Sequence, residues 1–257
     1  MYREKVVKSN LKRCFPSLSE ADRKTILRRF YRHFLDVIRE TAWSSILPQS
    51  YFRRHITYIG TDAMLDDARA HGGVMMMLGH LGCWEWLADF HHQIEAKGFT
   101  QYNVFRRQSN PLANRIIRRI RMKRGGGLID KDLLLREMVR LRHSTTIPCY
   151  GILCDQHPSP RSAQVWTTFL GQETAFPTGT EMLARRFGYP CYYVHITQPK
   201  RHYYTIEVKR LTGEGYSGEY PITQEFAHRL EENINEQPEQ WLWTHKRWKY
   251  TRPQSLS

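Results

Sequence analysis

The stretch Val74-Met75-Met76-Met77-Leu78-Gly79-His80-Leu81-Gly82-Cys83-Trp84-Glu85 organises the interpretation of the whole chain. Its first five residues are apolar and are followed by a glycine, which is typical of a buried strand that ends at the histidine. Gly82 permits a tight turn, and residues 84–90 then begin a helix-like pattern. The stretch therefore predicts that His80 lies at the carboxyl end of a strand, where ligand crevices of open α/β sheets are found.

Glu85 follows His80 by five residues, across one short turn. At this spacing a carboxylate can reach back to the imidazole and hold it in one tautomer, which is a common way to make a general base near neutral pH. The alternative is a packed histidine followed by a solvated helix residue. The pair alone does not choose between these interpretations, but the strand and turn around it favour a site.

Strand-length apolar runs alternate with helical patterns through most of the chain. We expect further strands at 101–105, 128–130, 146–154, 164–170, 190–197 and 203–210, and helices at 62–71, 131–142, 178–187 and 223–235, with another helix starting at Asn110-Pro111. This alternation predicts an α/β fold with a mainly parallel sheet covered by helices on both faces. Because no repeat, low-complexity tract or linker interrupts the pattern, we expect a single domain over residues 1–257.

The amino-terminal region predicts a long amphipathic helix that starts after Ser19. Ile26, Phe30, Phe34 and Ile38 recur every four residues, as on one face of a helix. The other face is basic and carries Arg23, Lys24, Arg28, Arg29, Arg32 and Arg39. Such a face can lie on anionic lipid, or it can be solvated while the apolar face packs on the core. We therefore divide the domain into a basic helical region, 1–45, and a catalytic α/β core, 46–257.

The formal net charge of +14 over 257 residues calls for an anionic partner, such as nucleic acid, an anionic membrane or a phosphorylated lipid. The five cysteines are odd in number and show no paired zinc spacing, so we expect reduced thiols and no metal site. No stretch approaches the roughly 20 apolar residues of a membrane span. The first residues, Met1-Tyr2-Arg3-Glu4-Lys5, do not read as a signal peptide.

Five segments resemble, in the same order, blocks of the bacterial lipid A late (lauroyl and myristoyl) acyltransferases, within the H-x-x-x-x-D/E lysolipid acyltransferases. The segment 79–85 resembles the H-x-G-N-W-E block of that family. The other four segments are Phe105-Arg106 with Asn110-Pro111 (Y-R and N-P), Asp155-Gln156 (D-Q), 169–184 (F-x-G, then G-x-x-x-L-A) and 238–249 (P-E-Q-W-x-W-x-H-x-R-W-K). The resemblance runs from Tyr2 to Lys249. Members of the family usually begin with a hydrophobic anchor, and we see none in this sequence.

The resemblance implies acyl transfer from a carrier-bound thioester to a hydroxyl of a lipid A precursor or related lysolipid. In this reaction His80 is the expected general base, and Glu85 is expected to orient its ring. Backbone N–H groups after His80, or Arg106, are candidates to stabilise the tetrahedral oxyanion. Cys83 lies three residues from His80 and is an alternative nucleophile. The family pattern has Asn there, so we expect Cys83 to fill space.

The resemblance also implies which residues bind the substrates. Arg106 and Asn110 carry over from the Y-R and N-P blocks, and an arginine suits paired hydrogen bonds to phosphate. Arg121 precedes Gly125 at the family's R-x-x-x-G spacing. Asp155 is expected to pair with an arginine or to line the pocket. Three more pocket residues come from the matching blocks: Gln156, Thr178 and Gly179.

The expected partners are an acyl carrier protein, or acyl-CoA as the donor, a lipid A precursor or lysolipid, and an anionic membrane surface. The expected place is the cytoplasmic face of the bacterial inner membrane, with the protein held there peripherally or through an anchor absent from this chain. The thioester is a co-substrate, and we expect no cofactor and no nucleic acid. Two alternatives remain. One is acyl transfer to a lysophospholipid or an aminolipid. The other is a basic nucleic-acid-binding protein without catalysis, although we find no helix-turn-helix, zinc finger or RNP motif.

Overall fold

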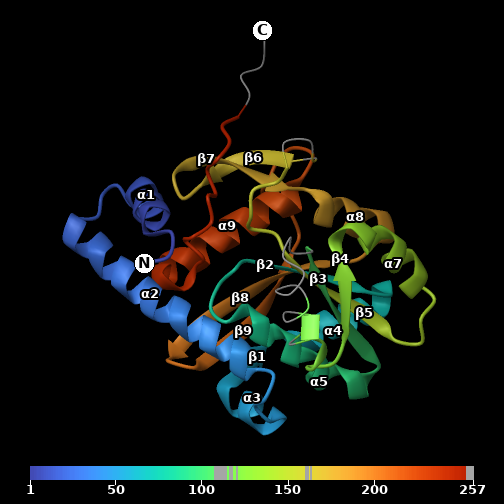
Figure 1. Cartoon of the computed structure of the whole chain (residues 1–257). Coiled ribbons are helices and arrows are strands. Elements are labelled where there is room, and N and C mark those ends of the chain that lie inside the picture. The colour runs from blue at the N-terminus through green and yellow to red at the C-terminus, as the bar shows by residue number, and fades with distance from the viewer. Residues whose placement is uncertain (107–114, 116–117, 120, 160–161, 163, 253–257) are drawn as a thin grey trace.

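The computed structural model describes residues 1–106, 115, 118–119, 121–159, 162 and 164–252 (Figure 1). Within these residues, seven strands form one sheet in the order β1-β9-β8-β2-β5-β3-β4. Their bounds are β1 Ile56–Ile59, β2 Val74–Leu78, β3 Phe99–Phe105, β4 Gly127–Asp130, β5 Ile147–Leu153, β8 Cys191–Lys200 and β9 Tyr203–Leu211. Every pairing is parallel except that of β8 with β9. The predicted mainly parallel sheet is thus confirmed.

The central strand β2 lies between β8 and β5, and all five of its side chains are buried. A strand covered on both faces has no polar side, which explains its unbroken apolar sequence. Its register with β5 pairs Leu78 with Leu153. The two parallel strands therefore end side by side, and the residues that follow them meet at one edge of the sheet.

Helices cover the two faces of the sheet. The longer ones in the core are α4 Thr61–His71, α7 Leu134–Leu141, α8 Gly179–Phe187 and α9 Pro221–Glu236. Shorter turns are η1 Trp84–Phe90, α5 His91–Ile94, η2 Glu95–Lys97, η3 Lys131–Leu133 and η4 Pro238–Gln240. In Figure 1, α8 and α9 lie above the sheet, and α4 and α5 lie below it. The helix expected to start at Asn110-Pro111 begins outside the described residues.

The amino-terminal region consists of α1 Glu4–Cys14, α2 Glu20–Trp43 and α3 Gln49–His55. The predicted long helix is confirmed as α2, and the Ser19 side chain caps it by accepting a hydrogen bond from the backbone N–H of Asp22. Its buried face carries two acids: Asp36 pairs with Arg201, and Glu40 accepts a hydrogen bond from Tyr204. We did not expect α1, α3 or β1, which are short and lack a clear sequence period.

Strands β6 Gln164–Phe169 and β7 Gln172–Pro177 form a separate antiparallel hairpin that contacts α9 (Figure 1). We predicted the first strand but not the second. The turn places Leu170 and Gly171 at positive φ, 51° and 70°. A positive φ costs little for glycine but is rare for leucine. Because Leu170 is not a typical turn residue, the sequence does not show where the chain reverses.

The carboxyl-terminal tail returns to the sheet. Leu81 and Trp241 form an isolated antiparallel bridge, and the N–H of Leu242 donates to the carbonyl of His80 at 3.1 Å. Trp241 and Trp243 are buried in the same hydrophobic core as residues from Val7 onwards. The indoles of these two residues are therefore part of the protein core.

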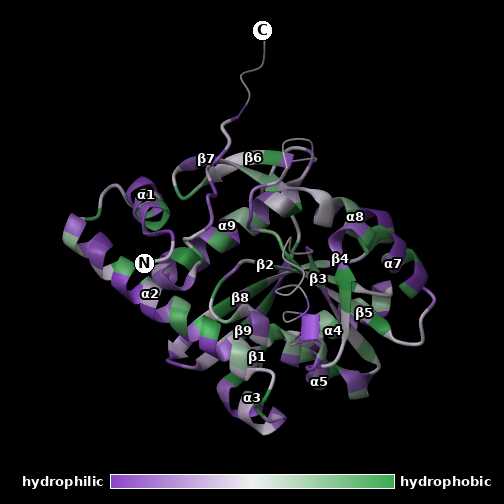
Figure 2. Cartoon of the chain, in the orientation of Figure 1, coloured by the Kyte–Doolittle hydropathy of each residue, from purple (hydrophilic) through white to green (hydrophobic). Residues whose placement is uncertain are grey.

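Figure 2 shows hydrophobic residues along the central strands and a mixture of hydrophobic and hydrophilic residues along α2. Among the described residues, we find no helix whose length and apolar character would let it cross a bilayer. The five cysteines are all free thiols and all buried.

Candidate active site

The ends of β2 and β5 bring His80 and Asp155 together. Each follows its strand by two residues, and the register of the strands sets them side by side. The Nδ1 atom of His80 lies 2.6 Å from Oδ1 of Asp155. The backbone N–H of His80 donates to Oδ2 of the same carboxylate at 2.9 Å. Asp155 therefore holds both the ring and the main chain of the histidine.

A third donor comes from the tail, because the indole N–H of Trp241 donates to Oδ2 of Asp155 at 2.9 Å. Asp155 is only 2% exposed. Burial by itself raises the pKa of this carboxyl, but the charge of His80 and the hydrogen bonds from His80 and Trp241 lower it to about 2. The carboxylate is therefore ionised at neutral pH and can only accept hydrogen bonds.

An ionised Asp155 determines the tautomer of the neutral His80 ring. Because the carboxylate cannot donate, the proton of the ring must lie on Nδ1. The other nitrogen, Nε2, is then left with its lone pair, and it lies 3.3 Å from the side-chain nitrogen of Gln156. Trp84 packs edge-on against the ring, with centroids 5.0 Å apart. This arrangement presents Nε2 as a base at the edge of the sheet.

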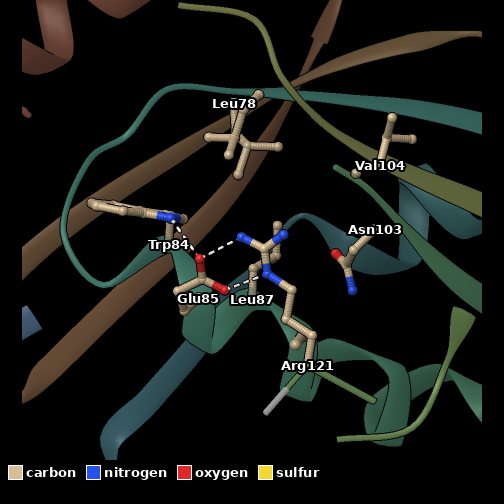
Figure 3. A pocket seen from close by; sticks show the side chains of 10 residues that line it. Leu78, Trp84, Glu85, Leu87, Asn103, Val104 and Arg121 are labelled. Carbon is tan, nitrogen blue, oxygen red and sulfur yellow. Dashed lines mark hydrogen bonds and ion pairs between the residues drawn. The ribbon is translucent and has the colours of Figure 1, made fainter. Parts of the chain in front are cut away.

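Glu85 has a different partner from the one expected. Its carboxylate forms two hydrogen bonds with Arg121, from Nε at 2.7 Å and from Nη2 at 2.5 Å, and it accepts a third from the Trp84 indole at 3.1 Å (Figure 3). The expectation that Glu85 orients His80 is therefore not matched by these contacts, in which Asp155 takes that place.

Two physical features account for this difference. Gly82 adopts φ 54°, and η1 begins at Trp84, whose ring rather than the Glu85 carboxylate contacts the imidazole. Arg121 also needs a carboxylate, because an unpaired cation is costly to bury. Burial lowers the pKa of Arg121, whereas the hydrogen bonds and charge of Glu85 raise it, with a net shift upward.

The ion pair of Glu85 and Arg121 lines a small cavity of about 30 Å³. Apolar side chains from the ends of three strands also line it: Leu78 and Val104, which Figure 3 labels, and Leu153. A space of this size accommodates one or two water molecules. Trp84 joins this cluster to His80, because its ring contacts the imidazole and its N–H binds Glu85.

The other predicted binding residues are spread more widely. Arg106 is exposed directly after β3, and Asn110 lies outside the described residues. Thr178 is fully buried, and its hydroxyl donates to the sulfur of Met182. Gly179 is the first residue of α8. The structure thus groups His80, Asp155 and Gln156 in one cluster and Glu85 with Arg121 in another.

Cys83 is buried behind the site and is 2% exposed. Burial raises the pKa of its thiol well above the ordinary value. Because the thiolate is the nucleophilic form of cysteine, this thiol is inert. This agrees with the expectation that Cys83 fills space.

Sequence reasoning did not assign Trp241 to this site, nor two residues near it, His157 and His245. The backbone N–H of His157 lies 3.5 Å from Nε2 of His245, and the two ring centroids are 4.9 Å apart. Burial lowers the pKa of His245 to about 4, so that ring is neutral at pH 7. The tail motif contains Trp241 and His245 but not His157. The bridge of Leu81 to Trp241 and the hydrogen bond of Leu242 to His80 bring the tail to the site.

Known proteins are similar to this chain along almost its whole length. The family model described as bacterial lipid A biosynthesis acyltransferase matches residues 1–250. A lipid A biosynthesis lauroyltransferase of Escherichia coli (strain K12) is 25% identical over 99% of this chain and 81% of its own length. A lipid A biosynthesis palmitoleoyltransferase of the same strain is 24% identical over 98% of this chain and 80% of its own. Lipid A biosynthesis acyltransferase 2 of Shigella flexneri is 21% identical over 92% and 74%.

Proposed function

The chain belongs to the bacterial lipid A biosynthesis acyltransferase family, and on this premise we propose that it moves a fatty acyl chain from acyl carrier protein, or from acyl-CoA, to a hydroxyl of a lipid A precursor. The protein is thus an acyltransferase. The single observation that carries the proposed mechanism is the hydrogen bond of His80 Nδ1 to the buried Asp155 carboxylate. The thioester supplies the activated acyl group, so the proposed reaction uses no further cofactor.

In this mechanism Nε2 of His80 takes the proton of the acceptor hydroxyl as its oxygen attacks the thioester carbonyl carbon. The resulting imidazolium is stabilised by the charge of Asp155, as in a catalytic triad. When the tetrahedral intermediate collapses, the carbon–sulfur bond breaks and the imidazolium returns the proton to the leaving thiolate. In this proposal the acceptor hydroxyl takes the place of the Gln156 amide nitrogen, which lies 3.3 Å from Nε2.

The oxyanion of the intermediate needs a donor. The backbone N–H groups of Leu81 and Gly82 already donate to the carbonyls of Gly79 and Gln240. We assign this role to Arg106, which is exposed after β3 and whose guanidinium is suited to an oxyanion. In this proposal Glu85 and Arg121 hold the wall of the site in place through their ion pair.

We further propose that the protein associates peripherally with the cytoplasmic face of the inner membrane through the second half of α2 and the residues after it. Four large apolar side chains are 45–73% exposed there: Leu35, Ile38, Trp43 and Ile46. Arg28, Arg32 and Arg39 are exposed on the same helix. Exposed apolar side chains beside cations suit an anionic lipid surface. Sedimentation with anionic vesicles should be lost in Leu35→Glu/Ile38→Glu and retained in a matched α7 variant, Leu135→Glu.

Acyl transfer is tested with a carrier thioester and a panel of acceptors that includes a lipid A precursor, a lysophospholipid and an aminolipid. His80→Ala should abolish turnover while circular dichroism and thermal melting stay unchanged. His143→Ala, in the exposed turn after α7, is the matched control and should keep wild-type turnover. Turnover by His80→Ala near the wild-type rate would disprove the mechanism. Transfer to the lysophospholipid or the aminolipid, but not to the lipid A precursor, would disprove the proposed acceptor.

A further inference from the structure

A second cavity, of about 220 Å³, lies between the β6–β7 hairpin and the carboxyl-terminal tail. The tail contributes Arg247, Trp248 and Tyr250, the hairpin contributes Trp166, and the loop after Asp155 contributes His157. His157 is only two residues from the carboxylate that holds His80. The cavity is therefore tied to the catalytic pair by a short loop, and the proposed mechanism does not use it.

Arg247 is a buried cation in the wall of this cavity, and it is 2% exposed. Its Nη2 donates to the carbonyl of Ala175 at 2.6 Å, and its guanidinium lies 4.5 Å from the ring centroid of Phe176. Nε has no hydrogen-bonding partner within the described part of the chain, and no carboxylate there comes within 4.0 Å of this side chain. Burial lowers the pKa of Arg247 to about 10, so it remains charged at pH 7. A buried charge of this kind is costly without a counter-ion.

The groups around Arg247 leave the cavity open to an anion. His245 is neutral at pH 7, since burial lowers its pKa to about 4. Glu173 also lines the cavity, but its carboxylate is paired with Arg252 at 2.9 Å. The charge of Asp155 acts on Arg247, but its carboxylate is hydrogen-bonded to His80 and Trp241 rather than to the guanidinium. Arg247 therefore has no hydrogen-bonded carboxylate of its own among the described residues.

The remaining wall is aromatic and hydrogen-bonding. Trp166, Trp248 and Tyr250 offer flat apolar surfaces, which suit the C–H faces of a sugar ring. Gln164 lines the same cavity, and its side-chain amide can bond to hydroxyl groups. The Thr174 hydroxyl also lines it but is already bonded to Gln172 and Trp248. A phosphate group alone does not need this volume or these walls, whereas one sugar ring with a phosphate uses both.

We propose that this cavity binds the phosphorylated sugar headgroup of the acceptor, with the phosphate on Arg247 and the ring against the aromatic wall. This proposal rests on the proposed function, because it takes the acceptor to be a glycolipid. Since the loop 155–158 joins the cavity to His80, a headgroup bound there holds its hydroxyl-bearing portion near Nε2. Arg247 is then a determinant of acceptor specificity rather than a catalytic residue.

The test is calorimetric titration of the full chain with glucose 1-phosphate and with glucose. Wild-type protein should bind the phosphorylated sugar more tightly by roughly tenfold to a hundredfold, the worth of a charge-assisted hydrogen bond or pair. Arg247→Met should lose this preference, and Trp166→Ala should weaken binding of both sugars. The matched control Arg140→Gln, on the exposed face of α7, should bind as wild type does. If Arg247→Met does not fold, Arg247→Lys and Trp166→Ala test the same site, and Lys should keep part of the preference.

Several outcomes would overturn the proposal: equal binding of the two sugars, wild-type binding by Arg247→Met, or displacement by inorganic phosphate as effective as that by glucose 1-phosphate. Stronger displacement of glucose 1-phosphate by phosphopantetheine would show that the cavity binds the phosphate of the acyl donor and not that of the acceptor. This outcome would also overturn the proposal. The binding test is independent of turnover. If wild-type protein transfers no acyl chain but binds sugar phosphate as expected, the proposed function fails and the cavity assignment stands. If acyl transfer proceeds and Arg247→Met binds the sugar phosphate as wild type does, the cavity assignment fails and the proposed function stands.

Discussion

Replacing Asp155 by Asn removes one charge from the site and preserves its shape. The two carboxylate oxygens are not equivalent: Oδ2 accepts from two donors, the His80 backbone and the Trp241 indole, both at 2.9 Å. Oδ1 is paired with Nδ1 of His80, at 2.6 Å. An asparagine side chain has one acceptor oxygen, and it should occupy the position with two donors, because an N–H group there would leave both of them unpaired.

The amide nitrogen of the Asp155→Asn variant would then point at Nδ1 of His80. Because this nitrogen donates, Nδ1 must accept, and the ring proton moves to Nε2, which can no longer act as a base. The variant also loses the charge that stabilises the imidazolium. A carboxylate-to-amide change that inverts the tautomer of a catalytic imidazole costs about 10⁴-fold in turnover. We expect a loss of ~10³–10⁴-fold here, or ~4–5.5 kcal/mol in the barrier.

The assay is acyl transfer from a carrier thioester to a lipid A precursor, with circular dichroism as the check on folding. Asp66→Asn is the matched control, because Asp66 is exposed on α4 and pairs with Arg69 at the surface. It should keep wild-type turnover. A folded Asp155→Asn variant that retains more than about a tenth of wild-type turnover would refute the assignment of Asp155.

Glu85→Gln and Arg121→Gln should each lower turnover and the melting temperature, because each breaks the same ion pair. The double variant should therefore lose no more turnover or stability than the more damaged single variant. Additive losses would show that Glu85 acts elsewhere. Burial lowers the pKa of His33 to about 4, so the native state resists protonation and stability falls as pH drops from 6.5 towards 4. Between pH 7 and pH 4.5, the free energy of unfolding should fall by about 2.5 kcal/mol less in His33→Leu than in the wild type, as measured by urea unfolding. The same pH dependence in both proteins would contradict this account. Finally, a thiol reagent should label none of the five buried cysteines in native protein and all five in urea, and rapid labelling of native Cys83 would reopen its role as a nucleophile.

The local elements were predictable where the sequence has a strong period or a clear stop. The strand β2 agrees with the expected range 74–78, and α2 follows its predicted cap at Ser19. The hairpin strand β7 and the first helix α1 were missed, because their residues are mixed in polarity and their contacts are with distant parts of the chain. Leu170 likewise has a positive φ in the hairpin turn, a conformation that the sequence would have indicated only with a glycine at that position.

The sequence by itself determined that a histidine would follow a buried strand, and that the chain resembles one acyltransferase family. It could not determine which carboxylate is hydrogen-bonded to His80, because spacing along the chain favours Glu85 whereas the register of β2 with β5 brings Asp155 to Nδ1. Only the tertiary structure decides this, since parallel strands that are neighbours in the sheet place residues 75 positions apart within one hydrogen bond. The same holds for Trp241 and Arg247, which approach the site through the return of the tail to Leu81.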